Sequence, residues 1–191
     1  MDIKEFFKQS EEICRKLSTE QLYQINHVIA MLEGAREHDK QVLIAGNGGS
    51  AGTASHLAAD LFKMGGIRAI CLNDNVPLQT AYINDDGWSN VYIEQLRRLL
   101  NESDIFIGIS VHGGVGEENA GEWSQNLNAA IGYTNANGGI SIGITGFDGG
   151  FMKEECHECI VVPAESTALV EAFHVVIHHL IAFSLYKGER K

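Results

Sequence analysis

Residues 41–60 read QVLIAGNGGSAGTASHLAAD, which is an apolar run, a glycine-rich turn and the start of a helical pattern. Such a turn exposes successive backbone N–H groups at the positive end of the following helix, and both features favour an anion. Gly46, Gly48 and Ala51 also satisfy the G-x-G-x-x-A pattern of dinucleotide-binding turns. The stretch therefore predicts a strand–loop–helix unit that binds phosphate. On its own it leaves three uses open: a dinucleotide, a sugar phosphate, or a tight turn without a ligand.

Short apolar runs continue to alternate with helical patterns along the chain. Strands are expected near residues 41–45, 67–72, 104–110, 139–144 and 159–162. Helices are expected near residues 51–63, 88–100, 123–135 and 166–186. Alternation at these lengths implies right-handed crossovers and a parallel sheet that helices cover on both faces. We therefore predict one α/β domain over residues 1–191, a three-layer sandwich around a five-stranded parallel sheet.

Two amphipathic helices are expected before the first strand, within residues 1–40. Ser18, with Gln21 three residues later, predicts a capping box at the start of the second helix. Helices that precede the sheet need a surface to cover. Residues 1–40 are therefore expected to take part in oligomer contacts.

The composition excludes several classes of protein. A formal net charge of −11 argues against a nucleic-acid surface, which needs a basic face. Residues 1–10 lack the apolar core of a signal peptide, and the apolar residues 168–186 include an acid and three histidines, which favours a buried helix over a membrane span. Four cysteines without an export signal suit a reducing compartment. We therefore expect a cytoplasmic protein without nucleic-acid or membrane partners.

Residues 104–130, DIFIGISVHGGVGEENAGEWSQNLNAA, form a second strand, glycine loop and helix. The loop is long for such a connection. Ser124, near the expected helix start, can cap the helix and also contact a phosphate oxygen.

Titratable side chains lie at helical spacing near the first turn. His56 and Asp60 are four residues apart and share one face of the helix after the turn. His174 and His178 have the same spacing on the last helix, whereas His179 is expected to point elsewhere. Imidazoles and carboxylates transfer protons and bind zinc, although a buried histidine can also be a hydrogen-bonded core residue.

An ordered set of motifs resembles the phosphoheptose isomerases of the sugar isomerase (SIS) family. The set comprises GNGGSA at 46–51, TAYINDDG at 80–87, IFIGIS at 105–110, ITGFDGG at 144–150, and a last helix with Glu171 and His178. The resemblance spans nearly the whole chain. It implies a flavodoxin-like SIS fold and a sugar phosphate as ligand, with no nucleotide cofactor.

The resemblance also implies an activity. It indicates an aldose–ketose isomerase that converts D-sedoheptulose 7-phosphate to D-glycero-D-manno-heptose 7-phosphate through an enediol, within heptose biosynthesis, as a homotetramer. Asp60 would be the catalytic base and His178 the acid, although the family normally has glutamate at position 60. The alternative on this fold is a non-catalytic sugar-phosphate sensor or a protein-binding adaptor that associates with a replication initiator. Retention of Asp60 and His178 favours the enzyme.

The substrate-binding residues that the resemblance implies lie on three loops. They are Asn47, Gly48, Gly49 and Ser50 in the first loop, Asp85 in the second, and Ser110, His112, Gly113, Gly114 and Ser124 in the third. The third loop departs from the family pattern by an insertion at residues 111–123, which leaves the exact ketose phosphate open.

Some family members bind zinc through the equivalents of His56, residue 60, His178 and a glutamine at position 170. Val170 cannot be a ligand, but His174 lies one helical turn further along and can replace it. The expected site for one divalent ion is therefore His56, Asp60, His174 and His178. The C-x-x-C motif at residues 156–159 has no second ligand pair, so we expect it to be structural.

Overall fold

The computed structural model describes residues 2–114, 123–186 and 188. Its centre is a sheet of five parallel strands in the order β2-β1-β3-β4-β5. The strands are β1 (Gln41–Gly46), β2 (Arg68–Cys71), β3 (Ile105–Ile109), β4 (Ile140–Thr145) and β5 (Glu158–Val161). Strands β1, β3 and β4 are buried along almost their whole length, as their continuous apolar sequences require. The predicted five-stranded parallel sheet is confirmed.

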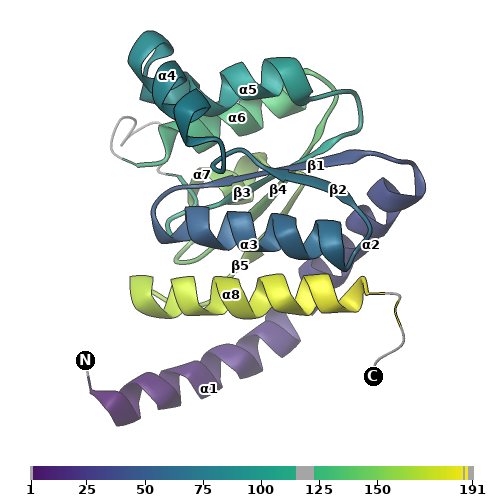
Figure 1. The fold of residues 1–191 in the computed structure, drawn as a ribbon. Helices are drawn as coiled ribbons and strands as arrows, with labels where there is room; N and C mark the ends of the chain where they lie inside the picture. Colours follow the sequence, from purple (N-terminus) through teal and green to yellow (C-terminus); the bar gives the residue numbers. More distant parts are fainter. Residues whose placement is uncertain (1, 115–122, 187, 189–191) are drawn as a thin grey trace.

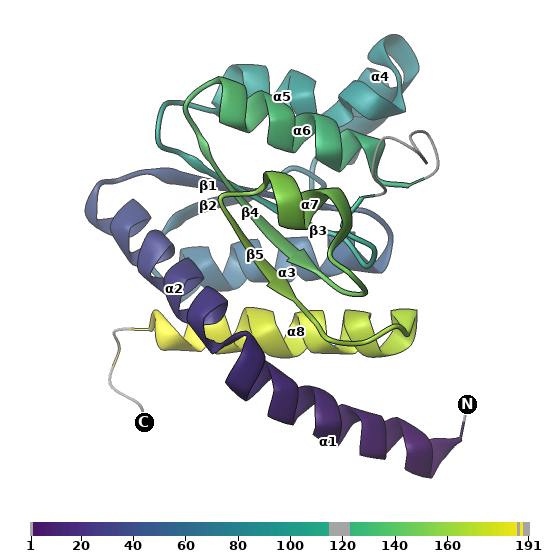
Figure 2. The ribbon, with the colours of Figure 1, turned by 180° about the vertical axis from the view of Figure 1, so that it is seen from behind.

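Helices cover both faces of this sheet (Figures 1 and 2). One face packs against α2 (Leu22–Glu37), α3 (Gly49–Lys63) and α8 (Thr167–Ser184), together with the buried end of α1 (Ile3–Glu20). The other face packs against α5 (Val91–Leu99), α6 (Gln125–Ala136) and α7 (Gly150–Glu155). The three-layer prediction is confirmed.

The loops after β1 and β3 meet where the chain reverses its direction across the sheet. From β1 the chain crosses to β2 at one edge, and it then returns to β3 on the other side of β1. In sheets of this type, ligands bind at the carboxyl ends of the strands beside such a switch point. Helices α3 and α8 lie side by side next to this point, so the fold brings residues 49–63 and 167–184 together.

The helical boundaries differ from the predicted ones at the N-terminus. Helix α1 continues to Glu20, so Ser18 lies inside it and its hydroxyl donates to the Arg15 carbonyl oxygen. Helix α2 begins at Leu22 without a side-chain cap. The predicted capping box is therefore wrong, because the Ser18 hydroxyl is used within the preceding helix.

Two short helices were not predicted. Helix α4 (Val76–Asp86) has no buried residue, so its sequence lacks the apolar stripe that reveals a helix. Helix α7 is only one and a half turns long. The predicted helix at 88–100 is divided into a 3₁₀ turn, η1 (Trp88–Asn90), and α5.

Helix α8 is long and apolar enough to cross a membrane by length and composition alone. In the structure one side of it packs on the sheet and on α3, and both His174 and His178 are fully buried there. This is the buried packing that its ionisable residues predicted.

Candidate active site

A cavity of about 430 Å³ lies where the loops after β1 and β3 meet. Its polar lining comes mainly from these loops, and its apolar walls include two indole rings. The lining residues are Asn47, Ser50, Trp88, Ile109, Ser110, Val111, His112, Trp123, Ser124 and Thr167. The cavity thus brings together five of the predicted substrate-binding residues. Thr167, Trp88 and Trp123 were not predicted.

The first loop is held tightly against the start of α3. A Cβ atom on Gly46 would lie 2.5 Å from the Ser50 carbonyl oxygen, so only glycine allows this approach. Gly48 has a φ of 57°, a conformation that side chains disfavour. Gly49 is the first residue of α3, and Ser50, which follows it, is buried and lines the cavity. The loop therefore presents Ser50 and the N-terminus of α3 to a ligand.

Side-chain amides connect the loop after β1 to the start of α6. Asn47 Nδ2 donates to Asn126 Oδ1 at 2.9 Å, and Asn126 Nδ2 donates back to Asn47 Oδ1 at 3.0 Å. The Tyr92 hydroxyl donates to the Gly46 carbonyl oxygen at 2.7 Å, and Asn73 bonds both the N–H and the carbonyl of Gly46. Sequence reasoning missed the supporting residues Asn73, Tyr92 and Asn126, because their contacts span from 27 to 79 positions along the chain.

The loop after β3 brings two serines together. Ser110 Oγ and Ser124 Oγ lie 3.2 Å apart, and Ser110 is buried. Ser124 precedes α6 with a φ of 57°, and its side chain makes no capping hydrogen bond. The predicted capping role of Ser124 is therefore wrong, since its hydroxyl points to Ser110 instead. Most of the predicted insertion, residues 115–122, lies outside the described residues.

His112 is fixed by aromatic neighbours. Its ring stacks on Trp123 with centroids 4.5 Å apart, and it contacts Phe147 at 4.2 Å. Gly113 and Gly114, which were predicted to bind the substrate, do not line the cavity. Their carbonyl oxygens accept hydrogen bonds from the first turn of α7, a helix that the sequence did not reveal.

Asp85 also lies outside the cavity lining. It is exposed on α4 and accepts a hydrogen bond from the Asn84 side chain at 2.7 Å. The nearby residue that does line the cavity is Trp88, which is 48% exposed.

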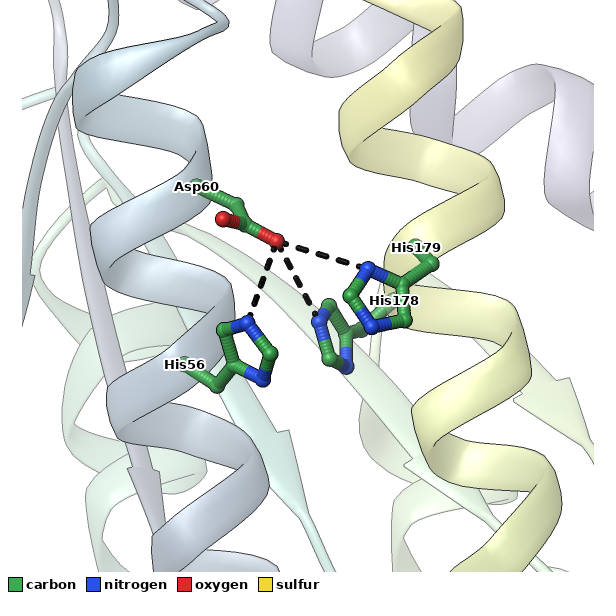
Figure 3. Close-up of side chains that lie close together, drawn as sticks. All are labelled: His56, Asp60, His178 and His179. Atoms are coloured by element: carbon green, nitrogen blue, oxygen red, sulfur yellow. Dashed lines mark ion pairs between the residues drawn. The ribbon is translucent and has the colours of Figure 1, made fainter.

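Four side chains converge between α3 and α8 (Figure 3). They are His56, Asp60, His178 and His179, which we call the imidazole cluster, and their ligand atoms lie within 4.8 Å of one another. Asp60 Oδ2 is 3.4 Å from His178 Nε2, 3.5 Å from His179 Nδ1 and 3.6 Å from His56 Nε2. The prediction that His179 points elsewhere is wrong, because α8 packs beside α3 with the rings of both His178 and His179 directed at Asp60.

His174 is not part of this cluster. It is fully buried, and burial lowers its pKa to about 4, although the backbone of Thr145 opposes this change. It is therefore neutral at neutral pH. Burial and the neighbouring imidazoles of His179 and His56 also lower the pKa of His178 to about 4, although Asp60 opposes this change. A neutral imidazole can donate one N–H and offers one lone pair.

The imidazole cluster fits a divalent metal ion. Buried atoms without a hydrogen-bond partner include Asp60 Oδ2, His178 Nε2 and His179 Nδ1. Such atoms are costly to bury unless a ligand completes them. Three imidazole nitrogens and one carboxylate form a donor set that zinc accepts.

The C-x-x-C motif has the properties of a structural element. Cys159 is buried and Cys156 is partly buried, and both sulfur atoms lie beside Gly143. Burial raises the pKa of Cys159 to about 11, and burial also raises the pKa of Cys156. Thiols with raised pKa values are poor nucleophiles and poor metal ligands.

Comparisons with known proteins agree with this fold. A family model described as SIS domain matches residues 5–146. Phosphoheptose isomerase 2 of Campylobacter jejuni is 32% identical over 177 residues, which are 86% of this chain and 84% of the relative. The lincomycin biosynthesis protein LmbN of Streptomyces lincolnensis is 39% identical over 149 residues, 73% of this chain, and the match spans only 53% of that relative. A solved phosphoheptose isomerase from Francisella tularensis shares the fold with a TM-score of 0.86 and 24% identity, over 96% of this chain and 95% of that one.

Proposed function

The chain belongs to the SIS domain family, and on that premise we propose that it is an aldose–ketose isomerase of the phosphoheptose type. The proposed reaction interconverts D-sedoheptulose 7-phosphate and D-glycero-D-manno-heptose 7-phosphate. One observation carries it: a carboxylate and a neutral imidazole, Asp60 and His178, meet at 3.4 Å between the same two helices whose first turns border the cavity. A sensor or adaptor would not need this pair.

The cavity suits the phosphate end of the substrate. Ser50, Ser110 and Ser124 offer hydroxyl donors, Asn47 offers an amide, and the N-terminus of α3 adds a positive partial charge. His112, held against Trp123, adds an imidazole at the same cavity. Along the axis of α3, Ser50 lies roughly 9 Å from His56 and roughly 15 Å from Asp60. The proposal therefore requires an extended heptose phosphate, with its phosphate in the cavity and its carbonyl end directed along α3 toward the imidazole cluster.

The chemistry then needs one base and one donor. In the direction from ketose to aldose, Asp60 removes a proton from C1, which gives an enediol, and the proton returns to C2. The neutral His178 donates an N–H to the oxygen at C2 and shifts the hydroxyl proton between O1 and O2. A zinc ion, when bound by the cluster, supplies a Lewis acid for the carbonyl oxygen. Aspartate in place of the family's glutamate requires the substrate to approach α3 more closely.

The assembly and location are part of the same proposal. Large apolar side chains are exposed on α1 and on the outer side of α8, including Ile3, Phe7, Val176, Leu180 and Phe183. This surface supports a homotetramer in which the N-terminal helices of the single domain contact other copies. All four cysteines are free thiols, which suits the cytoplasm. Sedimentation at micromolar concentration tests the tetramer.

Hydrogen–deuterium exchange by NMR tests the activity. The protein is incubated in D2O with sedoheptulose 7-phosphate, and separately with five- and six-carbon ketose phosphates, each with and without a chelator. We expect deuterium at the carbon next to the carbonyl, and loss of this exchange in Asp60→Asn and His178→Gln. Asp74→Asn, on an exposed loop, serves as the matched control. Binding without exchange for every ketose phosphate would favour the sensor instead.

A further inference from the structure

We propose that His179 is the fourth protein ligand of a metal centre formed with His56, Asp60 and His178. The inference concerns the proposed active site, but it rests on the proposed function only for the role of the ion. The family pattern would place the fourth ligand at position 170, where this chain has a buried valine. The structure assigns that role to a side chain nine residues further along α8.

The distances support a tetrahedral ion more than a set of hydrogen bonds. Three nitrogens lie 3.4, 3.5 and 3.6 Å from Asp60 Oδ2, which is long for charge-assisted hydrogen bonds. Zinc–nitrogen and zinc–oxygen bonds of about 2.0–2.1 Å give a ligand-to-ligand edge of roughly 3.3–3.4 Å in a tetrahedron. The three edges from Asp60 Oδ2 therefore have nearly the length that a shared ion requires, whereas the spacing among the four ligand atoms extends to 4.8 Å, so the nitrogens would move closer together when an ion binds.

The burial of the donor atoms points to a ligand as well. The His178 side chain is fully buried, and neither its nitrogens nor His179 Nδ1 has a hydrogen-bond partner. The three rings contact one another, with centroids 4.0–4.9 Å apart. Three imidazoles around one carboxylate leave lone pairs without hydrogen-bond donors, and a bound cation would accept these lone pairs.

His174 does not fulfil this role. It is as buried as His178, but its ring forms no ion pair with Asp60 and lies outside the convergent group. The two adjacent histidines use different atoms, Nε2 of His178 and Nδ1 of His179, which allows neighbouring residues of one helix to reach a single point. Three nitrogens and one oxygen favour zinc or cobalt over magnesium or calcium, which prefer oxygen ligands.

Cobalt titration of the chelator-treated protein tests the assignment. Tetrahedral Co²⁺ absorbs visible light strongly, so both the affinity and the geometry can be measured without an activity assay, while elemental analysis gives the stoichiometry. We expect one ion per chain in the wild-type protein and a loss of affinity of about 100-fold in His179→Ala. His179 is 42% exposed, so this variant should fold, and thermal unfolding checks that it does. His174→Phe should keep both the affinity and the spectrum.

Two results would overturn the assignment: a wild-type protein that binds no Co²⁺ or Zn²⁺, or a His179→Ala variant whose cobalt affinity and spectrum are unchanged. His38→Ala, which removes an exposed imidazole, controls for nonspecific binding. The proposed isomerase fails separately, since absence of deuterium exchange in the fully loaded wild-type protein would contradict the activity and leave the metal centre intact.

Discussion

The cavity at the loops and the imidazole cluster between the helices differ in how their polar groups are satisfied. In the cavity, Asn47 pairs with Asn126 and Ser110 lies beside Ser124, so these groups already have partners. In the cluster, buried nitrogens surround one carboxylate oxygen without hydrogen bonds. The first region therefore keeps its shape alone, as the proposed anion site requires, whereas the second has buried atoms that the proposed metal ion would complete.

The largest expected effect comes from Asp60→Asn, a substitution that should impair the imidazole cluster and leave the cavity unchanged. Asp60→Asn preserves the shape of the cluster but removes its negative charge and its base. We expect the isomerisation rate constant to fall about 10³-fold, because general acid–base groups contribute this order of magnitude. The dissociation constant for sugar phosphate, which depends on the cavity, should change by less than about threefold. A large increase in that constant would show that the two regions are not separate.

The next effect concerns stability rather than chemistry. The ordinary pKa of histidine is 6.5, and burial lowers that of His174 to about 4. Between these values the unfolded chain binds a proton that the folded chain does not, so stability falls as the pH falls through this window. At pH 5 the cost is about 2 kcal/mol. Urea unfolding at pH 7.5 and at pH 5 gives the decrease in the free energy of unfolding between these two pH values. This decrease should be smaller in His174→Leu than in the wild type by about this amount. It should be the same in His38→Ala as in the wild type.

A smaller effect tests the anion site. Ser110→Ala and Ser124→Ala should each weaken sugar-phosphate binding about tenfold, because a hydrogen bond to a charged group contributes about 1.5 kcal/mol or more. Both tryptophans of the chain line the cavity, so intrinsic fluorescence reports binding directly. Cobalt affinity should not change in either variant. Loss of cobalt binding in a serine variant would contradict the separation of the two regions.

The smallest effect tests whether the cavity is held by its own hydrogen bonds. Tyr92→Phe removes a hydroxyl that donates to the Gly46 carbonyl oxygen and accepts from Asn73 Nδ2, while that carbonyl still accepts a hydrogen bond from Asn73. We expect a loss of about 1 kcal/mol in the free energy of unfolding, measured with urea. Tyr23→Phe alters an exposed ring and should change nothing.

Much of the fold could be predicted because its signals are local. The strands at the centre of the sheet are continuous apolar runs, and the first glycine turn places Ser50 at a helix start. Helix α4 could not be predicted, since it has no buried residue, and Tyr82 and Ile83, which are partly buried against the core, are too few to give a helical periodicity. The loop after β3 does bring Ser110 and Ser124 together, but the position of Gly113 and Gly114 depends on α7, which is distant in sequence.

The sequence by itself determined the five strands and the longer helices between them, the glycine turn that places Ser50 at a helix start, and the pairing of His56 with Asp60 on one helical face, because each depends on residues a few positions apart. Only the tertiary structure decided that His179, and not His174, faces Asp60. Helical spacing shows which residues share a face, but the direction in which that face points is set by the packing of α8 against α3 and the sheet.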